Sequence, residues 1–576
     1  MFKPLRQLLP TYSRQYKEEI SQRITWGHWF TLFNVVLALC ISTRYAFNAD
    51  WPNTLSGKLY FFTSLFGHFS FIIFAAYLLL LFPLSFIIKN ERTFRGLSVI
   101  IATIGQTVLL VDTEVFKQFY LHLSPLVWDL LVTPYDNSEL SHQWQLLFVP
   151  MPIILLAQML YSRWCWQKLR SFSRQKWGKF VALFFVACFT ATHLIYAWAD
   201  IRLYRPITSQ KSNYPLSHPM TARNFLAKHG VINRTKLQLN IAENGRLDSF
   251  YLNYPKQHLT FNRKPYTNVL IVNMSGLANE MIVAEKMPHL TQISEKTYRF
   301  MNHYGSGDSS AANLLGIFYS LSGQYLDSML ANKQTSPLLT AFEQADYQFG
   351  LFSHNSFATP IYQQSIFAGF SLPKIKGNAQ AIETWTAWLN QRLAKPFFSY
   401  LALSMPSTHD SLAPLEHVDA QFNQIWYTLQ QHNLLMNTLV IITADQANPA
   451  TEMNFTKRHL QVPMMIYWQG ENQKINVLSS HLDLLPTLLM QLFAVNNPIN
   501  DYAQGVNLTS PNERIWALAS NHKWTVAIMP NGEQYHLDKF GHFEKYNANG
   551  EKVQTKRPPL ALFLQMIKQS NQFVEK

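Results

Sequence analysis

Five apolar runs in the first two hundred residues constrain this chain more than any other feature of its sequence. They are Ile24–Phe47, Leu59–Ile88, Gly96–Val111, Trp144–Tyr161 and Phe180–Ala199. A helix needs roughly 20 apolar residues to cross the hydrocarbon core of a bilayer, and these runs reach or approach that length. The first run is too long for the core of a secretion signal and lacks a small-residue cleavage site, so it is interpreted as an uncleaved span. The sequence therefore predicts a helical membrane domain of five spans over residues 24–200.

The charges between the runs predict how the spans are oriented. Lysine and arginine fill two short loops, residues 89–95 and 163–179, whereas the loop 112–143 carries five acidic residues and one lysine. Because cytoplasmic loops are enriched in Lys and Arg, we expect residues 1–23 and both basic loops on the cytoplasmic side. Five spans then leave the C-terminal part outside. The net charge of +14 follows from this topology, so no nucleic-acid partner is expected.

A basic, aromatic segment joins the last span to the soluble part. Residues 200–230 hold five Lys or Arg against one acid, Asp200, with two tyrosines between them. Such a segment suits anionic lipid headgroups, since each cation near a charged membrane contributes about 1 kcal/mol, but a solvated linker would have the same composition. Pro219 and Thr221 predict the start of a short amphipathic helix that ends at Gly230. We assign 201–265 to a basic juxtamembrane linker and 266–576 to a soluble domain.

Two histidines, His28 and His68, lie within the predicted spans. Ionisable side chains inside a membrane are functional candidates. The structural alternative is a neutral histidine that bonds a backbone carbonyl, and the sequence leaves both open.

The soluble part alternates strand-like and helix-like segments. Continuous apolar runs such as Asn268–Met274 and Thr438–Thr443 are typical of buried parallel strands, and helices are predicted between them. This alternation predicts an α/β domain with a mostly parallel sheet. From residue 514 onward, turns at Asn531-Gly532 and Asn549-Gly550 and a final apolar-periodic helix predict a small β-hairpin and helix extension, 514–576.

Three segments of the soluble part resemble landmark segments of the alkaline phosphatase and sulfatase superfamily. They are NTLVIITAD (Asn437–Asp445), HLQVPMMIYW (His459–Trp468) and SHLDLLPTLL (Ser480–Leu489). Together with the five predicted spans and the junction sequence SHPMTAR, the whole chain resembles the YejM/PbgA family of inner-membrane proteins of Gram-negative bacteria. The resemblance implies a multi-pass inner-membrane protein with a cytoplasmic N-terminus and a periplasmic, sulfatase-like domain.

The family resemblance also implies a role in lipopolysaccharide homeostasis. Family members sense lipid A on the periplasmic side and act through a membrane adaptor protein that serves a protease, which restrains degradation of the lipid A deacetylase. Cardiolipin binding is ascribed to them as well. The implied partners of this chain are therefore lipopolysaccharide or lipid A, cardiolipin or another anionic phospholipid, and that adaptor protein.

The same resemblance implies the positions of a metal-dependent site, from which this chain departs. Active relatives hold divalent metals with an acid after the first strand, a nucleophilic Thr or Ser at a helix start, and an Asp-His pair after a later strand. Here these positions are Ser275, Ser309 and the pair Asp445-Gln446, so one carboxylate remains. Because a neutral serine and a neutral amide bind a divalent metal weakly, we expect no required cofactor and a vestigial nucleophile position at Ser309.

Two classes of function compete. The first is a non-catalytic lipid sensor. The second is a metal-dependent phosphatase, or a phosphoethanolamine- or phosphoglycerol-type transferase acting on lipids, with a divalent metal held by Asp445, His459 and His481; cardiolipin binding or transport is a further alternative. The sensor is favoured because a phosphoryl-transfer site without one of its acids lacks charge that stabilises the transition state.

The predicted lipid-binding residues cluster in the junction. Arg223, Thr221 and the N–H groups of a helix start suit phosphate, and the apolar side chains suit acyl chains. The full set is Met220, Thr221, Ala222, Arg223, Phe225, Lys228, Arg202 and Arg205.

Overall fold

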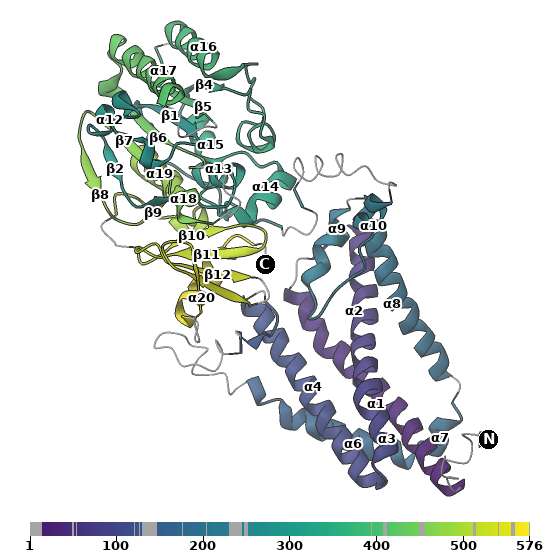
Figure 1. The fold of residues 1–576 in the computed structure, drawn as a ribbon. Helices are drawn as coiled ribbons and strands as arrows, with labels where there is room; N and C mark the ends of the chain where they lie inside the picture. The colour runs from purple at the N-terminus through teal and green to yellow at the C-terminus, as the bar shows by residue number, and fades with distance from the viewer. Residues whose placement is uncertain are drawn as a thin grey trace, which may run out of the picture. The chain divides into compact units, whose positions relative to one another are not determined.

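The chain divides into two units, Met1–Arg234 and Thr235–Glu575 (Figure 1). The computed structural model describes residues 14–48, 51–52, 54–119, 121–125, 127–128, 147–175, 177–202, 204–229, 245–246, 251–392, 394–406, 412–447, 455–510, 514–538, 541–554 and 559–574.

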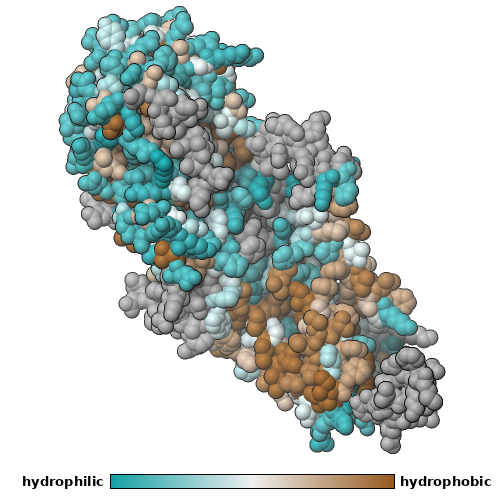
Figure 2. Space-filling model, viewed as in Figure 1, coloured by the Kyte–Doolittle hydropathy of each residue, from teal (hydrophilic) through white to brown (hydrophobic). Residues whose placement is uncertain are grey.

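Long apolar helices build the first unit. They are α1 (Arg14–Asn48), α2 (Leu55–Ala76) with its continuations η2 (Tyr77–Leu81) and α3 (Phe82–Ile87), α4 (Glu91–Phe119), α6 (Met151–Gln167), α7 (Leu169–Ser173) and α8 (Trp177–Arg202). Among the described residues, four helical segments are long and apolar enough to cross a membrane: Lys17–Phe47, Leu55–Ile87, Glu91–Lys117 and Trp177–Arg202. Figure 2 shows hydrophobic residues gathered on the surface of this unit, as a bilayer environment requires.

The predicted span Trp144–Tyr161 differs from what the structure shows. Helix α6 begins at Met151 and covers 17 residues, a length of about 26 Å against roughly 30 Å for the hydrocarbon core. The helix starts later in the sequence than predicted. Pro150 is its N-cap and Pro152 lies in its first turn, the part of a helix where a residue without an N–H is tolerated. Residues 144–146 lie outside the described residues. The described helices thus give four candidate spans, where the sequence predicted five.

A buried polar cluster joins α1, α4 and α6. Gln158 Nε2 donates to Asn34 Oδ1 at 2.6 Å, and Gln106 Nε2 donates to the Asn34 backbone oxygen at 2.9 Å. These three side chains are at most 4% exposed. Polar groups in a protein interior satisfy one another in this way, so the cluster ties the short helix α6 to its neighbours.

Gly67 allows α2 and α8 to pack backbone against backbone. A Cβ atom at this position would lie 2.7 Å from the Phe189 nitrogen and 2.8 Å from the Cys188 carbonyl carbon. Real Cβ atoms do not approach backbone atoms so closely, so only glycine fits here.

The junction folds back onto the first unit. It forms α9 (Arg205–Thr208), η4 (Ser209–Ser212) and α10 (Arg223–Lys228). Tyr214 is 3% exposed and packs on the rings of Phe69 and His68, and Pro215 O accepts a hydrogen bond from His68 Nε2 at 2.8 Å. His68 is thus bound to a carbonyl, the structural alternative above. The predicted helix reaches Lys228, and its expected end, Gly230, lies outside the described residues.

A seven-stranded sheet forms the centre of the second unit. Its order is β4-β5-β1-β6-β7-β2-β8, with parallel pairs from β4 to β6 and antiparallel pairs at β6–β7 and β7–β2, so the sheet is mostly parallel. The strands are β1 (Asn268–Ser275), β2 (Tyr298–Phe300), β4 (Gln348–Ser353), β5 (Phe397–Ser404), β6 (Thr438–Thr443), β7 (Met464–Tyr467) and β8 (Gln473–Ile475).

Helices cover both faces of this sheet (Figure 1). Alternate residues of β1 enter two separate cores: Val269 packs with α13, α15 and α19, and Leu270 packs with α12, α16 and α17. Burial on both faces explains why the strand sequences are continuously apolar. The helices are α12 (Pro288–Ser294), α13 (Ser310–Tyr319), α14 (Leu326–Asn332), α15 (Pro337–Gln344), α16 (Gly377–Gln391), α17 (Leu412–Gln431), α18 (Lys457–Leu460) and α19 (Leu484–Phe493).

The C-terminal extension is larger than the predicted hairpin. Five strands form an antiparallel meander and precede the final helix α20 (Leu560–Ser570). They are β10 (Ala517–Ser520), β11 (Trp524–Ile528), β12 (Gln534–Asp538), β13 (Phe543–Tyr546) and β14 (Lys552–Val553). Strands of two to five residues are too short to show a clear period in the sequence, which is why the meander was underestimated.

Candidate functional site

The carboxyl ends of β1 and β6 bring together three residues of the predicted degenerate site. Ser275 is the last residue of β1, and Asp445 and Gln446 follow β6, its neighbour in the sheet. Gln446 Nε2 donates to Ser275 Oγ at 3.4 Å, and the Gly276 amide donates to the Gln446 carbonyl at 2.9 Å. The two positions where the resemblance implied an acid and a histidine therefore hold a neutral side-chain contact.

Asp445 is buried at this edge and 3% exposed. Its Oδ2 atom accepts a hydrogen bond from Ser310 Oγ, and its backbone oxygen accepts one from Asn313 Nδ2 at 2.7 Å. Burial raises the pKa of the Asp445 carboxyl above its ordinary value, and the bond from Ser310 opposes this. A carboxyl held in this way favours its neutral form more than a metal-binding carboxylate does.

Ser309 caps helix α13, and its neighbour Ser310 contacts the acid. Ser309 Oγ accepts a hydrogen bond from the Ala312 amide at 3.3 Å, as an N-cap serine does. The sequence predicted Ser309 at the vestigial nucleophile position and missed the bond between Ser310 and Asp445. Both serines lie at the start of the helix. Which of them contacts Asp445 depends on how the helix is rotated about its axis, and the sequence does not reveal this rotation.

His481 belongs to a buried chain of hydrogen bonds. Its Nε2 donates to Ala444 O at 2.9 Å, so its Nδ1 accepts from His303 Nε2 at 3.0 Å, and His303 Nδ1 in turn contacts Ser479 Oγ at 2.9 Å. Burial lowers the pKa of His481 to about 4 and that of His303 well below its ordinary value. Both ring nitrogens of His481 are engaged, so neither is available to a metal in this arrangement.

The three residues predicted as metal ligands do not form a metal centre. His459 lies in α18 and is 5% exposed. Within the described ranges, no group of three or more His, Cys, Asp or Glu side chains lies close enough to hold a metal ion, and Asp445, His459 and His481 all fall in those ranges. Among the described residues, these three side chains therefore do not make a site for a divalent metal.

His354 belongs to this edge of the sheet and was missed in the sequence. It directly follows β4, and its Nδ1 contacts Ala402 O of β5 at 3.4 Å. Burial lowers the pKa of His354, and the charge of Asp445 acts in the opposite direction, so the two side chains interact electrostatically. The apolar run that His354 directly follows was the available signal in the sequence, since polar groups at the carboxyl ends of parallel strands share one edge.

Asp483, in the third landmark segment, has a structural role. It accepts from the Ser480 amide at 2.7 Å in a capping box and pairs with Arg514 at 2.5 Å while fully buried. This pair ties the start of α19 to the C-terminal meander.

The predicted lipid-binding segment has an acidic partner. Arg223 pairs through its guanidinium with Asp200 at 2.8 Å, and the amides of Ala222 and Arg223 donate to the same carboxylate at 3.1 Å. Two of the N–H groups expected to bind phosphate are therefore occupied. Met220 and Phe225 are 48% and 64% exposed, which leaves their apolar side chains accessible.

The remaining predicted residues with polar side chains differ in their exposure. Thr221, Arg202 and Lys228 are exposed and Arg205 is half-buried. The Met220 amide donates to His193 Nδ1 on α8 at 3.1 Å, so the segment is attached to α8.

Comparison with known proteins covers the full length of the chain. The family described as "Domain of unknown function (DUF3413)" matches residues 13–261, and the family "Sulfatase" matches residues 406–493. An uncharacterized protein of Haemophilus influenzae is 46% identical over 583 residues, which cover 98% of each chain. The "Inner membrane protein YejM" of Salmonella typhi and that of Salmonella typhimurium are each 40% identical over 585 residues, which cover 98% of this chain and 99% of theirs.

Proposed function

Since the chain belongs to the family of the inner membrane protein YejM, we propose that it is a non-catalytic sensor of lipopolysaccharide in that membrane. In this proposal, the junction binds lipid A, or another anionic lipid such as cardiolipin, on the periplasmic side. The helical unit passes the signal to a membrane adaptor protein that controls the stability of the lipid A deacetylase. The α/β unit lies in the periplasm and has the sulfatase-like fold without its chemistry.

The neutral contact between Gln446 and Ser275 carries the non-catalytic part of the proposal. Phosphoryl and sulfuryl transfer need positive charge held against the developing negative charge of the transition state, and a bound metal commonly supplies this charge where several carboxylate or imidazole ligands hold it. Asp445 alone, buried and with a raised pKa, does not provide that ligand set.

The chemistry of the junction supports the lipid-binding part. Thr221 and Lys228 are exposed on the same segment as the apolar side chains of Met220 and Phe225, and Arg202 is exposed at the end of α8. Such cationic, hydroxyl and apolar groups suit a phosphorylated headgroup attached to acyl chains. Arg223 enters this arrangement as half of an ion pair, so a lipid phosphate would compete with Asp200 for its guanidinium.

Lipid retention by two charge-reversal variants tests the proposal. We expect Arg223→Glu to lose most of the lipopolysaccharide that co-purifies with the full-length protein, whereas Lys211→Glu on the same segment retains most of it. Cardiolipin and thermal stability are measured in the same samples to separate specific loss from weaker binding of all anionic lipids and from misfolding. Equal losses of lipopolysaccharide and cardiolipin in both variants would show that the cations of residues 200–230 attract all anionic lipids without specificity, which would overturn the proposal.

A further inference from the structure

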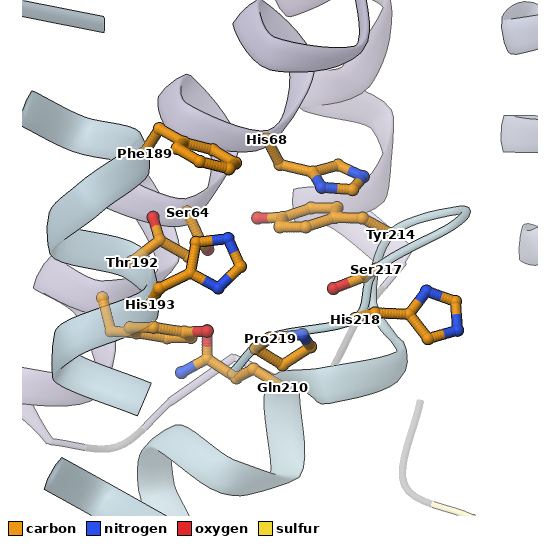
Figure 3. A pocket seen from close by; sticks show the side chains of 11 residues that line it. Ser64, His68, Phe189, Thr192, His193, Gln210, Tyr214, Ser217, His218 and Pro219 are labelled. Atoms are coloured by element: carbon orange, nitrogen blue, oxygen red, sulfur yellow. The ribbon is translucent and has the colours of Figure 1, made fainter. Parts of the chain in front are cut away.

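A small polar cavity lies between α2, α8 and the part of the junction that folds back onto them (Figure 3). Its volume is about 20 Å³, enough for one or two water molecules or for one hydroxyl-bearing carbon. Ser64 and His68 line it from α2, Thr192 and His193 from α8, and Gln210 and Ser217 from the junction. In Figure 3, the ring of His193 and the hydroxyl group of Ser217 face the cavity from opposite sides.

An unsatisfied acceptor identifies this cavity as a binding site. Gln210 is 5% exposed, and its Nε2 donates to Gly57 O at 3.0 Å and Pro206 O at 2.7 Å. Both bonds fix the orientation of the amide. The other amide atom, Oε1, is buried and has no hydrogen-bond partner among the described residues. Because an unpaired buried acceptor is unfavourable, a donor from a ligand would stabilise the site.

The histidines add one donor and one acceptor. Because the Met220 amide can only donate, His193 Nδ1 is an acceptor and the proton of this ring is on Nε2. Because Pro215 O can only accept, His68 Nε2 carries the proton and leaves Nδ1 as an acceptor in the neutral ring. The cavity thus combines unpaired acceptors with a donor.

None of the residues that line the cavity is an acid, a lysine or an arginine. An ammonium group would therefore find no carboxylate, and a phosphate no lysine or arginine, which makes both unfavourable in a partly buried site. A neutral hydroxyl group fits, because it donates to Gln210 Oε1 and accepts from His193 Nε2 at the same time. Since the helices around the cavity are candidate membrane spans, the molecules that reach it most readily are lipids.

We propose that this cavity binds a glycerol hydroxyl group, presented by a lipid headgroup, between Gln210 and His193. This site is separate from the ion pair of Arg223 and does not depend on lipid A being the ligand there. It gives the junction a means of recognising a headgroup by its hydroxyl group as well as by its charge.

Two phospholipids of equal charge test the site. Phosphatidylglycerol ends in glycerol hydroxyl groups, whereas phosphatidylserine has the same net charge and no hydroxyl group. Native mass spectrometry of the full-length protein, titrated with each lipid on identical acyl chains, is expected to show about fivefold tighter binding of phosphatidylglycerol, the value of roughly one hydrogen bond. Equal affinity of the wild-type protein for the two lipids would overturn the proposal.

Three variants assign the preference to the cavity. Ser217→Leu fills it without removing a side-chain hydrogen bond that the structure shows, and Gln210→Met removes the unpaired acceptor; both are expected to abolish the preference. Lys211 lies on the same segment but does not line the cavity. Lys211→Gln is therefore expected to lower the affinity for both lipids equally and to keep the preference for phosphatidylglycerol. Because Gln210→Met also loses two structural bonds, thermal stability is measured for each variant, and a preference kept in folded Ser217→Leu contradicts the proposal.

Free glycerol distinguishes the two sources of the hydroxyl group. If it fails to displace phosphatidylglycerol, the site recognises the hydroxyl only as part of a lipid. If free glycerol displaces phosphatidylglycerol and removes the preference for it over phosphatidylserine, the same site accepts soluble polyols. This result would support binding of a hydroxyl group that comes from a soluble molecule instead of a lipid.

Discussion

The Asp200 carboxylate accepts from both the side chain and the backbone of Arg223, 23 residues further along the chain. The guanidinium Nε lies 2.8 Å from Oδ1 and the amide nitrogen 3.1 Å from Oδ2, and Asp200 itself is 2% exposed. One acid therefore caps the start of α10 and neutralises its first cation.

Replacing this acid separates its two roles. Asp200→Asn keeps an oxygen for the backbone amides but removes the charge. We therefore expect phosphorylated lipids to bind more tightly. We also expect the free energy of opening of α10, measured by hydrogen exchange, to fall by about 1–3 kcal/mol. Lipid titration and hydrogen exchange of residues 222–229 measure both effects. Glu114→Gln, which removes the acid that pairs with Arg44 in the same unit, is the control and should leave both unchanged. Weaker lipid binding in Asp200→Asn would contradict the idea of competition for Arg223.

Removing the hydroxyl group of Ser309 should affect stability and no reaction. Its Oγ caps α13, so Ser309→Ala is expected to cost about 1 kcal/mol. Assays of the full-length protein with phosphatase, sulfatase and phosphoethanolamine-transfer substrates, with and without divalent metals, should give the same rates for the variant and the wild type. A metal-dependent rate that falls in folded Ser309→Ala would reveal an enzyme.

The buried histidines predict that the α/β unit loses stability in acid. The pKa of His481 is about 4 in the folded protein against 6.5 for an unperturbed histidine, so the unfolded chain binds the proton first. The stabilisation is complete above pH 6.5 and is lost as the pH falls toward 4, by about 3 kcal/mol for this group. Asp445, whose pKa is raised, opposes part of the loss.

Hydrogen exchange of residues 479–493 in the full-length protein, corrected for the intrinsic pH dependence of exchange, measures this loss. The glutamine in His481→Gln can bond Ala444 and His303 but does not titrate. In this variant, the protection of residues 479–493 from hydrogen exchange should therefore fall less between pH 7 and pH 5 than in the wild type. The exposed His522→Gln serves as a control with the wild-type slope. If protection in His481→Gln fell with pH as steeply as in the wild type, other groups would cause the acid sensitivity.

Truncation tests which unit contacts the adaptor protein. The first unit ends at Arg234 and contains all four candidate spans and the basic helix α7. A chain cut after Arg234 is expected to retain co-purification of the adaptor and viability of the cell, since only this unit reaches the cytoplasm in the proposed topology. The chain from Thr235 onward, exported to the periplasm, is the matched control. Retention by the control alone would assign the contact to the α/β unit.

Local patterns allowed the sheet to be predicted, and contacts between distant residues limited the rest. β1 and β6 are continuous apolar runs buried on both faces, so their positions were evident from the sequence, whereas the grouping of Ser275, Asp445 and Gln446 in one site was implied by the family resemblance. The pairing of Asp200 with Arg223 and the insertion of Tyr214 among the helices depend on how the chain turns back after α8. No spacing rule encodes that turn.

Gly67 sets the dimensions of the cavity without lining it. It lies on α2 between two residues that do line it, Ser64 and His68, and faces the backbone of α8 beside Phe189. Adding one methyl group there would act as a wedge, forcing the two helices apart over the stretch where they enclose the polar space. If the cavity binds a hydroxyl group as proposed, we expect Gly67→Ala to change its ligand preference through the spacing of the two helices, while every group that lines the cavity stays chemically intact.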